Sequence, residues 1–189
     1  EGGTPDWCLR ILRHEVGHYY WDRLIWDSPW LNDFRKLFGD ERANYADALK
    51  HHYDNGPPAD WEQRFLTTYA SCHPWEDWAE TWAQYLHIED TLVTALSFGL
   101  GSSDIELDIE PFTKEMLWQP NVEGADEFLE FANAWVELTG VMNELSRSMG
   151  VHDMYPFVLN QAVLAKLHFI HCVVRETRAA ARRAAQAKV

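Results

Sequence analysis

A histidine, a glutamate and a second histidine lie close together in the stretch RHEVGHYYWD, residues 13–22. On a helix, His14 and His18 stand about one turn apart on one face, so both imidazoles can bind a single metal ion. Glu15 lies next to this face and can take a proton from water at such an ion. The spacing therefore predicts one catalytic Zn²⁺ with Glu15 as general base. The alternative is a pair of core histidines whose hydrogen bonds are satisfied by Asp22 and the backbone.

The helical pattern around the motif favours the metal site. Both histidines share an arc of the helical wheel with Trp21 and Ile25, so they are expected to point inward, where unpaired imidazoles cost desolvation free energy. Asp22 falls a turn beyond His18 and is expected to hold the tautomer of an imidazole. Gly17 costs about 1 kcal/mol relative to alanine inside a helix. Its presence indicates that another element approaches the helix closely at that point.

A catalytic zinc site needs a third protein ligand and an open position for water. The segment HPWEDWAETWAQYLHI, residues 73–88, offers candidates on a predicted helix. Glu76 and Glu80 fall at the edge of its tryptophan-rich face, whereas Asp77 falls on the polar face toward water. We expect Glu76 to be the third ligand and Glu80 to hydrogen-bond a ligand histidine. Asp77 or His73 stay open as ligands, since the phase of a helix start is defined only to within a residue or two, and His73 is a candidate substrate contact.

The elements that must position these residues are helical, and the predicted fold class is mainly α, with little or no β-sheet. Helices are predicted over residues 6–26, 31–38, 44–53, 61–70, 74–98, 125–149 and 158–189. The alternating stretch IELDI, residues 105–109, is the one strand candidate. We expect a single domain over residues 1–189, with a metal-site half in 1–98 and a C-terminal helical half in 99–189. Ala79 and Ala83 would let the second site helix lie close to Gly17.

Composition excludes several classes of partner. The net charge is −14, whereas a nucleic-acid-binding surface needs an excess of basic residues, so neither nucleic acid nor an anionic membrane is expected as a partner. The chain contains no apolar run of the roughly eighteen residues that a membrane-spanning helix needs. Its three cysteines, Cys8, Cys72 and Cys172, form no CxxC pair, which favours reduced thiols and a cytoplasmic location.

Three stretches together resemble a bacterial family of zinc-binding metallopeptidases: HEVGHYYWDRL, SCHPWEDWAETWAQYLHI and LSRSMGVHDMYPFVL. The likeness runs from about residue 10 to about residue 175. Members of this family are similar to gluzincins, in which a glutamate on a later helix completes the HExxH site, so the resemblance implies a zincin-like helical domain and a hydrolase. Zincins usually carry a small sheet before the active-site helix, and its edge strand binds the substrate backbone. The residues before His14 are instead predicted to start a helix, which is a departure from that pattern.

The predicted activity is hydrolysis of a peptide or protein substrate by metal-activated water, with Glu15 as base. The tetrahedral intermediate needs a further hydrogen-bond donor, and Tyr155 in HDMYPF is a candidate catalytic residue for that role. A buried structural role for Tyr155 is the alternative. The other function considered is a zinc-binding domain with weak or no catalysis that regulates or binds other proteins, for want of the edge strand. Retention of Glu15 favours the peptidase, because a structural site needs no general base.

Overall fold

The computed structural model describes residues 5–100, 110–155 and 157–187. Its helices are α1 (Pro5–Leu24), α2 (Leu31–Phe38), α3 (Tyr45–Asn55), α4 (Trp61–Arg64), α5 (Pro74–Ser97), α6 (Ala125–Ser148) and α7 (Gln161–Gln186), with 3-10 turns η1 (Tyr69–Ser71) and η3 (Lys114–Met116). The described ranges contain no strand, which confirms the mainly α fold class. The strand candidate at residues 105–109 lies outside them. None of the described helices is long and apolar enough to cross a membrane.

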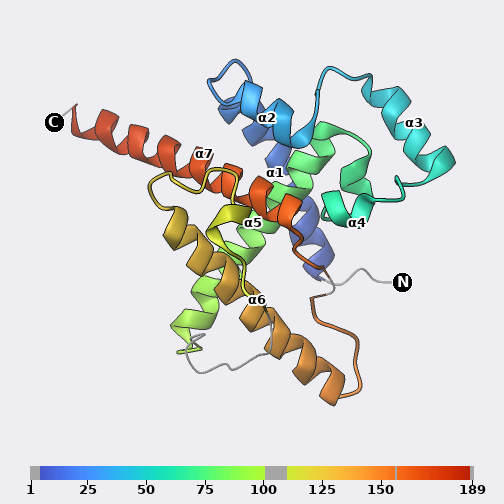
Figure 1. The fold of residues 1–189 in the computed structure, drawn as a ribbon, viewed down its shortest axis with the longest axis vertical. Coiled ribbons are helices and arrows are strands. Elements are labelled where there is room, and N and C mark those ends of the chain that lie inside the picture. The colour runs from blue at the N-terminus through green and yellow to red at the C-terminus, as the bar shows by residue number, and fades with distance from the viewer. Residues whose placement is uncertain (1–4, 101–109, 156, 188–189) are drawn as a thin grey trace.

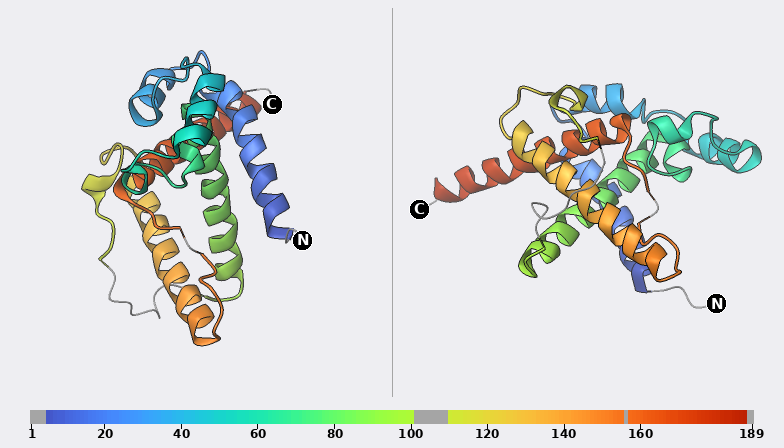
Figure 2. Two further views of the ribbon diagram at one scale, coloured as in Figure 1. Left: turned by 90° about the vertical axis from the view of Figure 1, so that its right-hand side faces the viewer. Right: turned by 60° about the horizontal axis from the view of Figure 1, so that its bottom comes forward.

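Helix α5 is the centre of the arrangement, and it contacts α1, α2, α6 and α7 (Figure 1). Helices α1 and α5 lie side by side, and α6 and α7 cross α5 (Figure 2). Helix α1 runs antiparallel to α5: His18 meets Glu76 in the first turn of α5, whereas Arg13, nearer the start of α1, bonds Asp90 in its second half. This antiparallel pairing places the HExxH motif against the first turns of α5.

An aromatic cluster holds α1 against α5 near the C-terminal end of α1. Phe34 stacks on Phe38 of the same helix at 4.9 Å between ring centroids, and Trp21 of α1 meets Phe34 edge-on at 5.6 Å. Trp78 of α5 lies 5.8 Å from Phe38, and Phe169 of α7 completes the cluster at 5.9 Å from the same ring. Burying rings of this size contributes much of the packing free energy of a small domain. The cluster therefore ties four helices together beside the metal-site residues.

The predicted helix over residues 61–70 is wrong beyond its first turn. Helix α4 ends at Arg64, and Phe65 is extended, with φ −130° and ψ 156°. The hydroxyl oxygen of Thr67 then accepts a hydrogen bond from Ala70 N–H of η1 at 3.1 Å. Side-chain bonds of this kind compete with helix continuation. The irregular backbone that results carries residues 67–69 to the start of α5.

The expectation that Asp77 faces water is also wrong. Its side chain is 1% exposed and accepts a hydrogen bond from Lys166 of α7 at 2.6 Å. Lys166 donates a second bond to the carbonyl of Arg64 at 2.7 Å. Burial raises the pKa of the Asp77 carboxyl to about 6, against the opposing effect of Lys166. Asp77 is thus covered by α7 and forms a buried ion pair with Lys166.

Gly17 is a point of close approach between α1 and α5, in agreement with its expected role. A Cβ atom at Gly17 would lie 3.0 Å from the Cα atom of Ala79 and 3.3 Å from the Cβ atom of Trp82. The carbonyl of Gly17 also accepts a hydrogen bond from the indole N–H of Trp78 at 2.9 Å. The absence of a side chain at residue 17 therefore sets the distance between the two helices that carry the site.

Substitution Gly17→Ala tests this contact through the sign of the change in the free energy of unfolding. Helix propensity alone would raise the free energy of unfolding by about 1 kcal/mol, whereas forcing a methyl group against the Ala79 backbone costs about 1–3 kcal/mol. We expect a net decrease, measured by urea unfolding. Leu12→Ala, at a 59% exposed position of α1, is the control and should change the value little. A more stable Gly17→Ala protein would contradict the close approach.

Candidate metal centre

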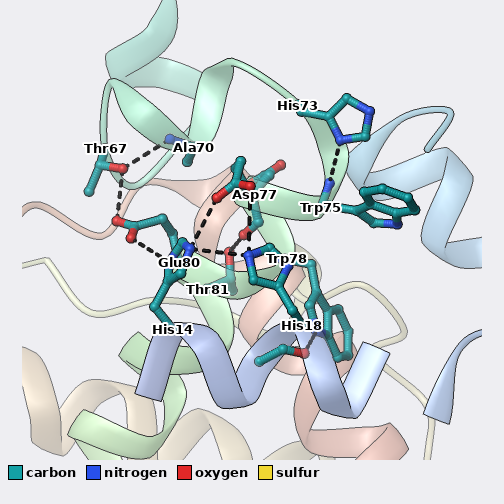
Figure 3. A network of polar contacts seen from close by, with 12 residues as sticks. His14, His18, Thr67, Ala70, His73, Trp75, Asp77, Trp78, Glu80 and Thr81 are labelled. Carbon is teal, nitrogen blue, oxygen red and sulfur yellow. Dashed lines mark hydrogen bonds and ion pairs between the residues drawn. The ribbon is translucent and has the colours of Figure 1, made fainter. Parts of the chain in front are cut away.

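The structure brings His14, His18 and Glu76 together at the α1–α5 contact. Their ligand atoms all lie within 4.8 Å of one another. His14 Nε2 is 3.2 Å from His18 Nε2 and 3.0 Å from Glu76 Oε2, and His18 Nε2 is 3.6 Å from Glu76 Oε1. Figure 3 shows both imidazoles extending from α1 toward the first turns of α5. Two nitrogens and a carboxylate thus converge on one point, as the HExxH spacing and the wheel of α5 predict.

The spacing of these atoms fits a tetrahedral zinc ion. Ligands at about 2.0–2.1 Å from zinc in tetrahedral geometry stand roughly 3.3 Å from one another, which is close to the separations seen here. Glu76 Oε2 is buried and forms no well-directed hydrogen bond among the described residues, although it lies 3.0 Å from His14 Nε2. A buried carboxylate oxygen without a hydrogen bond is costly, and a cation between the three side chains would satisfy it.

Glu80 lies one turn after Glu76 and fixes the orientation of His14. Its Oε1 atom is 2.9 Å from His14 Nδ1, and because an ionised carboxylate only accepts, the imidazole donates from Nδ1. The Nε2 lone pair of His14 is then directed at the convergence point. Thr67 and Arg10 donate to the other oxygen of Glu80 at 2.9 and 2.7 Å. Both oxygens of Glu80 are therefore engaged, one of them with His14, the histidine contact expected from the place of Glu80 on the wheel.

The carboxylates of Glu76 and Glu80 make a positive charge at the centre electrostatically favourable. Burial alone would lower the pKa of His14, but contacts with the carboxylates of Glu76 and Glu80 outweigh it and raise the pKa to about 9. Burial would likewise raise the pKa of Glu76, but His14, His18 and Tyr45 hold it well below its usual range. Before a metal ion binds, a proton on His14 therefore supplies the positive charge at neutral pH.

A cavity of about 430 Å³ opens at the ligands and is lined by His14, Glu15, His18, Trp21, Asp22, Tyr45, Tyr69, Trp75 and Glu76. Glu15 is exposed to this cavity, as a base acting on water must be. Asp22 is also exposed on its wall, and within the described ranges it forms no hydrogen bond to either histidine. The structure therefore gives no support to Asp22 as the residue that holds an imidazole tautomer, a task that Glu80 performs for His14.

Two other candidate residues lie away from this cavity. Tyr155 is 7% exposed and packs edge-on against Trp135 at 4.8 Å, in the wall of a different cavity. This position agrees with a buried structural role for Tyr155 and does not agree with a role as oxyanion donor at the metal centre. His73 is 3% exposed: its Nδ1 caps α5 by accepting from Trp75 N–H at 3.2 Å, and its Nε2 donates to the carbonyl of Ala43 at 3.1 Å. With both ring nitrogens engaged, His73 serves the start of α5 and does not line the metal cavity.

Two tyrosines at the centre have no counterpart in the sequence prediction. Tyr45, at the start of α3, donates a hydrogen bond to Glu76 Oε1 at 2.9 Å. Tyr69 of η1 lines the same cavity, with its ring 6.1 Å from that of His14. Burial, together with nearby Glu76, raises the pKa of both phenols. They stay protonated and able to donate at neutral pH. No spacing rule links residues 45 and 69 to the HExxH motif, so only the fold reveals them.

Comparison with known proteins places the chain in a family. Residues 8–173 match a protein family described as "putative zinc-binding metallo-peptidase". The chain belongs to this family. It is also 46% identical over 169 residues to an uncharacterized protein of Mycobacterium bovis and to two of Mycobacterium tuberculosis. These matches cover 89% of this chain but 46% of each relative, so the chain spans about half the length of the curated relatives it matches. No solved structure gives a significant match.

The paired substitutions Glu76→Gln and Asp77→Asn separate the two carboxylates that the sequence leaves as alternatives. Glu76→Gln should lose bound zinc, since it removes a charged ligand. Asp77→Asn should keep one zinc per chain but lower the free energy of unfolding by about 3 kcal/mol, because Lys166 is left with an uncompensated buried charge. Zinc content by atomic emission and unfolding in urea give the two readings. Zinc loss in Asp77→Asn, with zinc retained in Glu76→Gln, would reverse the assignment.

The raised pKa of His14 predicts that zinc binding is coupled to proton release. Below a pKa of about 9 the imidazole is protonated, so zinc must displace that proton, and the apparent affinity for zinc falls as the pH falls. Calorimetric titration near neutral pH, in two buffers of different ionisation enthalpy, should show release of about one proton attributable to His14. Glu80→Gln should release less, since one of the carboxylates that raise this pKa is then neutral. Equal release in both proteins would contradict the stated cause.

Proposed function

We propose that this chain is a zinc-dependent peptidase domain that hydrolyses peptide bonds, with His14, His18 and Glu76 as metal ligands and Glu15 as general base. The observation that carries the proposal is the convergence of the three ligand atoms within 4.8 Å at a cavity that Glu15 also lines. A purely structural zinc site is closed by four protein ligands, whereas a hydrolytic site keeps one position open. Within the described ranges, the group contains three candidate ligands.

The site residues have distinct roles in this reaction. Bound zinc would supply a Lewis acid that polarises the scissile carbonyl and acidifies water. Glu15 accepts a proton from the attacking water and delivers it to the leaving nitrogen. Glu80 holds His14 in the tautomer that directs Nε2 at the ion, and Tyr45 keeps one oxygen of Glu76 hydrogen-bonded. The buried carboxylates thus orient ligands, while the exposed one transfers protons.

Two independent observations support this proposal over a zinc-binding domain without catalysis. The family to which the chain belongs is described as "putative zinc-binding metallo-peptidase". The cavity at the ligands is open and polar, about 430 Å³ in volume, and can admit a segment of a peptide. Peptides or proteins are the substrate class that follows. One metal ion per chain is the stoichiometry that follows from a single group of ligands in the described part of the chain.

Substitution Glu15→Gln tests the catalytic role without disturbing the ligands. We expect zinc content to be unchanged and peptide cleavage to fall by about 10²–10⁴-fold, the usual contribution of a general base. The measurement is digestion of a random peptide library by the zinc-loaded protein, read by mass spectrometry. Glu62→Gln, at an exposed position of α4, is the matched control and should cleave like the wild type. The same cleavage profile in Glu15→Gln and wild type would remove the base from the mechanism.

A further inference from the structure

Asp22 is a carboxylate of the metal cavity that takes no part in holding the candidate metal ligands. It is exposed on the cavity wall, and within the described ranges it forms no hydrogen bond or ion pair. The next residue along the chain is basic, but the guanidinium of Arg23 donates to the Tyr19 hydroxyl at 3.3 Å and lies 5.5 Å from the centre of the Tyr19 ring. The carboxylate of Asp22 is therefore free to bind a group that enters the cavity.

Asp22 lies in one row along α1 with His18 and Glu15, because residues three and four positions apart share a face of a helix. At a rise of about 1.5 Å per residue, Glu15 precedes His18 by about 4.5 Å along the helix axis, and Asp22 follows it by about 6 Å. The candidate ligand His18 therefore lies between two exposed carboxylates. Glu15 serves the leaving nitrogen in the proposed reaction, so the acyl part of the substrate extends toward Asp22.

The charges on the wall of this cavity favour a cation near Asp22. No lysine or arginine lines it among the described residues. Glu76 faces the two histidines and the metal ion that they would hold, whereas Glu15 and Asp22 have no counter-charge in the described part of the chain. The remaining walls are aromatic and are formed by Trp21, Tyr45, Tyr69 and Trp75. Such walls accommodate a cation or its aliphatic stem, and the free carboxylates disfavour an acidic group.

We propose that Asp22 is a specificity-determining residue that binds a cationic group on the acyl side of the scissile bond. Two substrate groups have this chemistry: the free α-amine of an N-terminal residue, and the side chain of a lysine or arginine that supplies the scissile carbonyl. Either would form a charge-assisted hydrogen bond with the carboxylate of Asp22. The inference rests on the proposed peptidase function, because it names the substrate class of the same site.

Three hydroxamates test this inference by binding instead of cleavage. The hydroxamate group chelates zinc through two oxygens, so it anchors each probe at the metal while the acyl part varies. Norleucine hydroxamate carries a free α-amine, Nα-acetyllysine hydroxamate carries a basic side chain, and N-acetylnorleucine hydroxamate carries neither. In calorimetric titration, we expect at least one cationic probe to bind the zinc-loaded wild type about 10–100-fold more tightly than the neutral probe. The probe that binds more tightly identifies the cation as the α-amine or the side chain.

Two variants assign this preference to a single carboxylate. Asp22→Asn keeps the size of the side chain and removes its charge. It should abolish the difference between cationic and neutral probes without changing the affinity for N-acetylnorleucine hydroxamate. Asp126→Asn removes the same charge from an exposed position of α6, and as the matched control it should bind all three probes like the wild type. One zinc ion per chain in both variants shows that the metal centre is intact.

The inference is overturned if the neutral probe binds and neither cationic probe binds more tightly, a result that leaves the proposed peptidase standing. It is also overturned if Asp22→Asn retains the full difference. That outcome is expected if Glu15, the net charge of −14 or coordination of the amine to zinc causes the preference. Loss of zinc in Asp22→Asn would make Asp22 part of the metal centre and would overturn it as well. If no probe binds the zinc-loaded protein, the proposed function fails and the inference fails with it.

Discussion

The close contact between α1 and α5 at Gly17 is the constraint on which the candidate metal centre depends. A methyl group at Gly17 would lie only 3.0 Å from the Ala79 Cα atom. The backbones of the two helices are therefore close enough for side chains of one helix to contact those of the other. Histidines one residue to one turn away from that contact then reach glutamates on the opposite helix. The hydrogen bond from Trp78 to the Gly17 carbonyl and the buried ion pair of Asp77 with Lys166 hold α5 in the same position.

The second determinant is the balance of charge around that contact. Glu76 and Glu80 are 2% and 8% exposed, which would be unfavourable for two carboxylates without compensating charge. Arg10 and Thr67 satisfy one oxygen of Glu80, and Tyr45 satisfies one of Glu76. The remaining oxygens face His14, whose pKa rises in response. The centre is thus built so that a cation, whether a proton or a metal ion, stabilises it. Two imidazole nitrogens beside a carboxylate are a donor set that suits a divalent metal ion.

The features of this centre that lie within a single helix can be predicted from the sequence, because helical periodicity alone decides which side chains share a face. The spacing of His14 and His18 and the wheel positions of Glu76 and Glu80 are properties of single helices. Residues that depend on the packing of distant elements cannot be predicted in this way. The sequence places Asp77 in water because nothing near it along the chain indicates that Lys166, on α7, covers that face. Tyr45 reaches the centre from α3, and Tyr155 lies in another cavity, for the same reason: their positions follow from tertiary packing.

X-ray absorption spectroscopy of the zinc-loaded protein tests the central claim most directly, since it reports the atoms bound to the metal without reference to activity. The ligand set described above predicts two imidazole nitrogens at about 2.0–2.1 Å and carboxylate or water oxygens at similar distances, with no sulfur. A zinc–sulfur distance of about 2.3 Å would place the ion at a cysteine such as Cys72 and contradict the assignment. A shell made only of oxygen, without imidazole scattering, would contradict it as well.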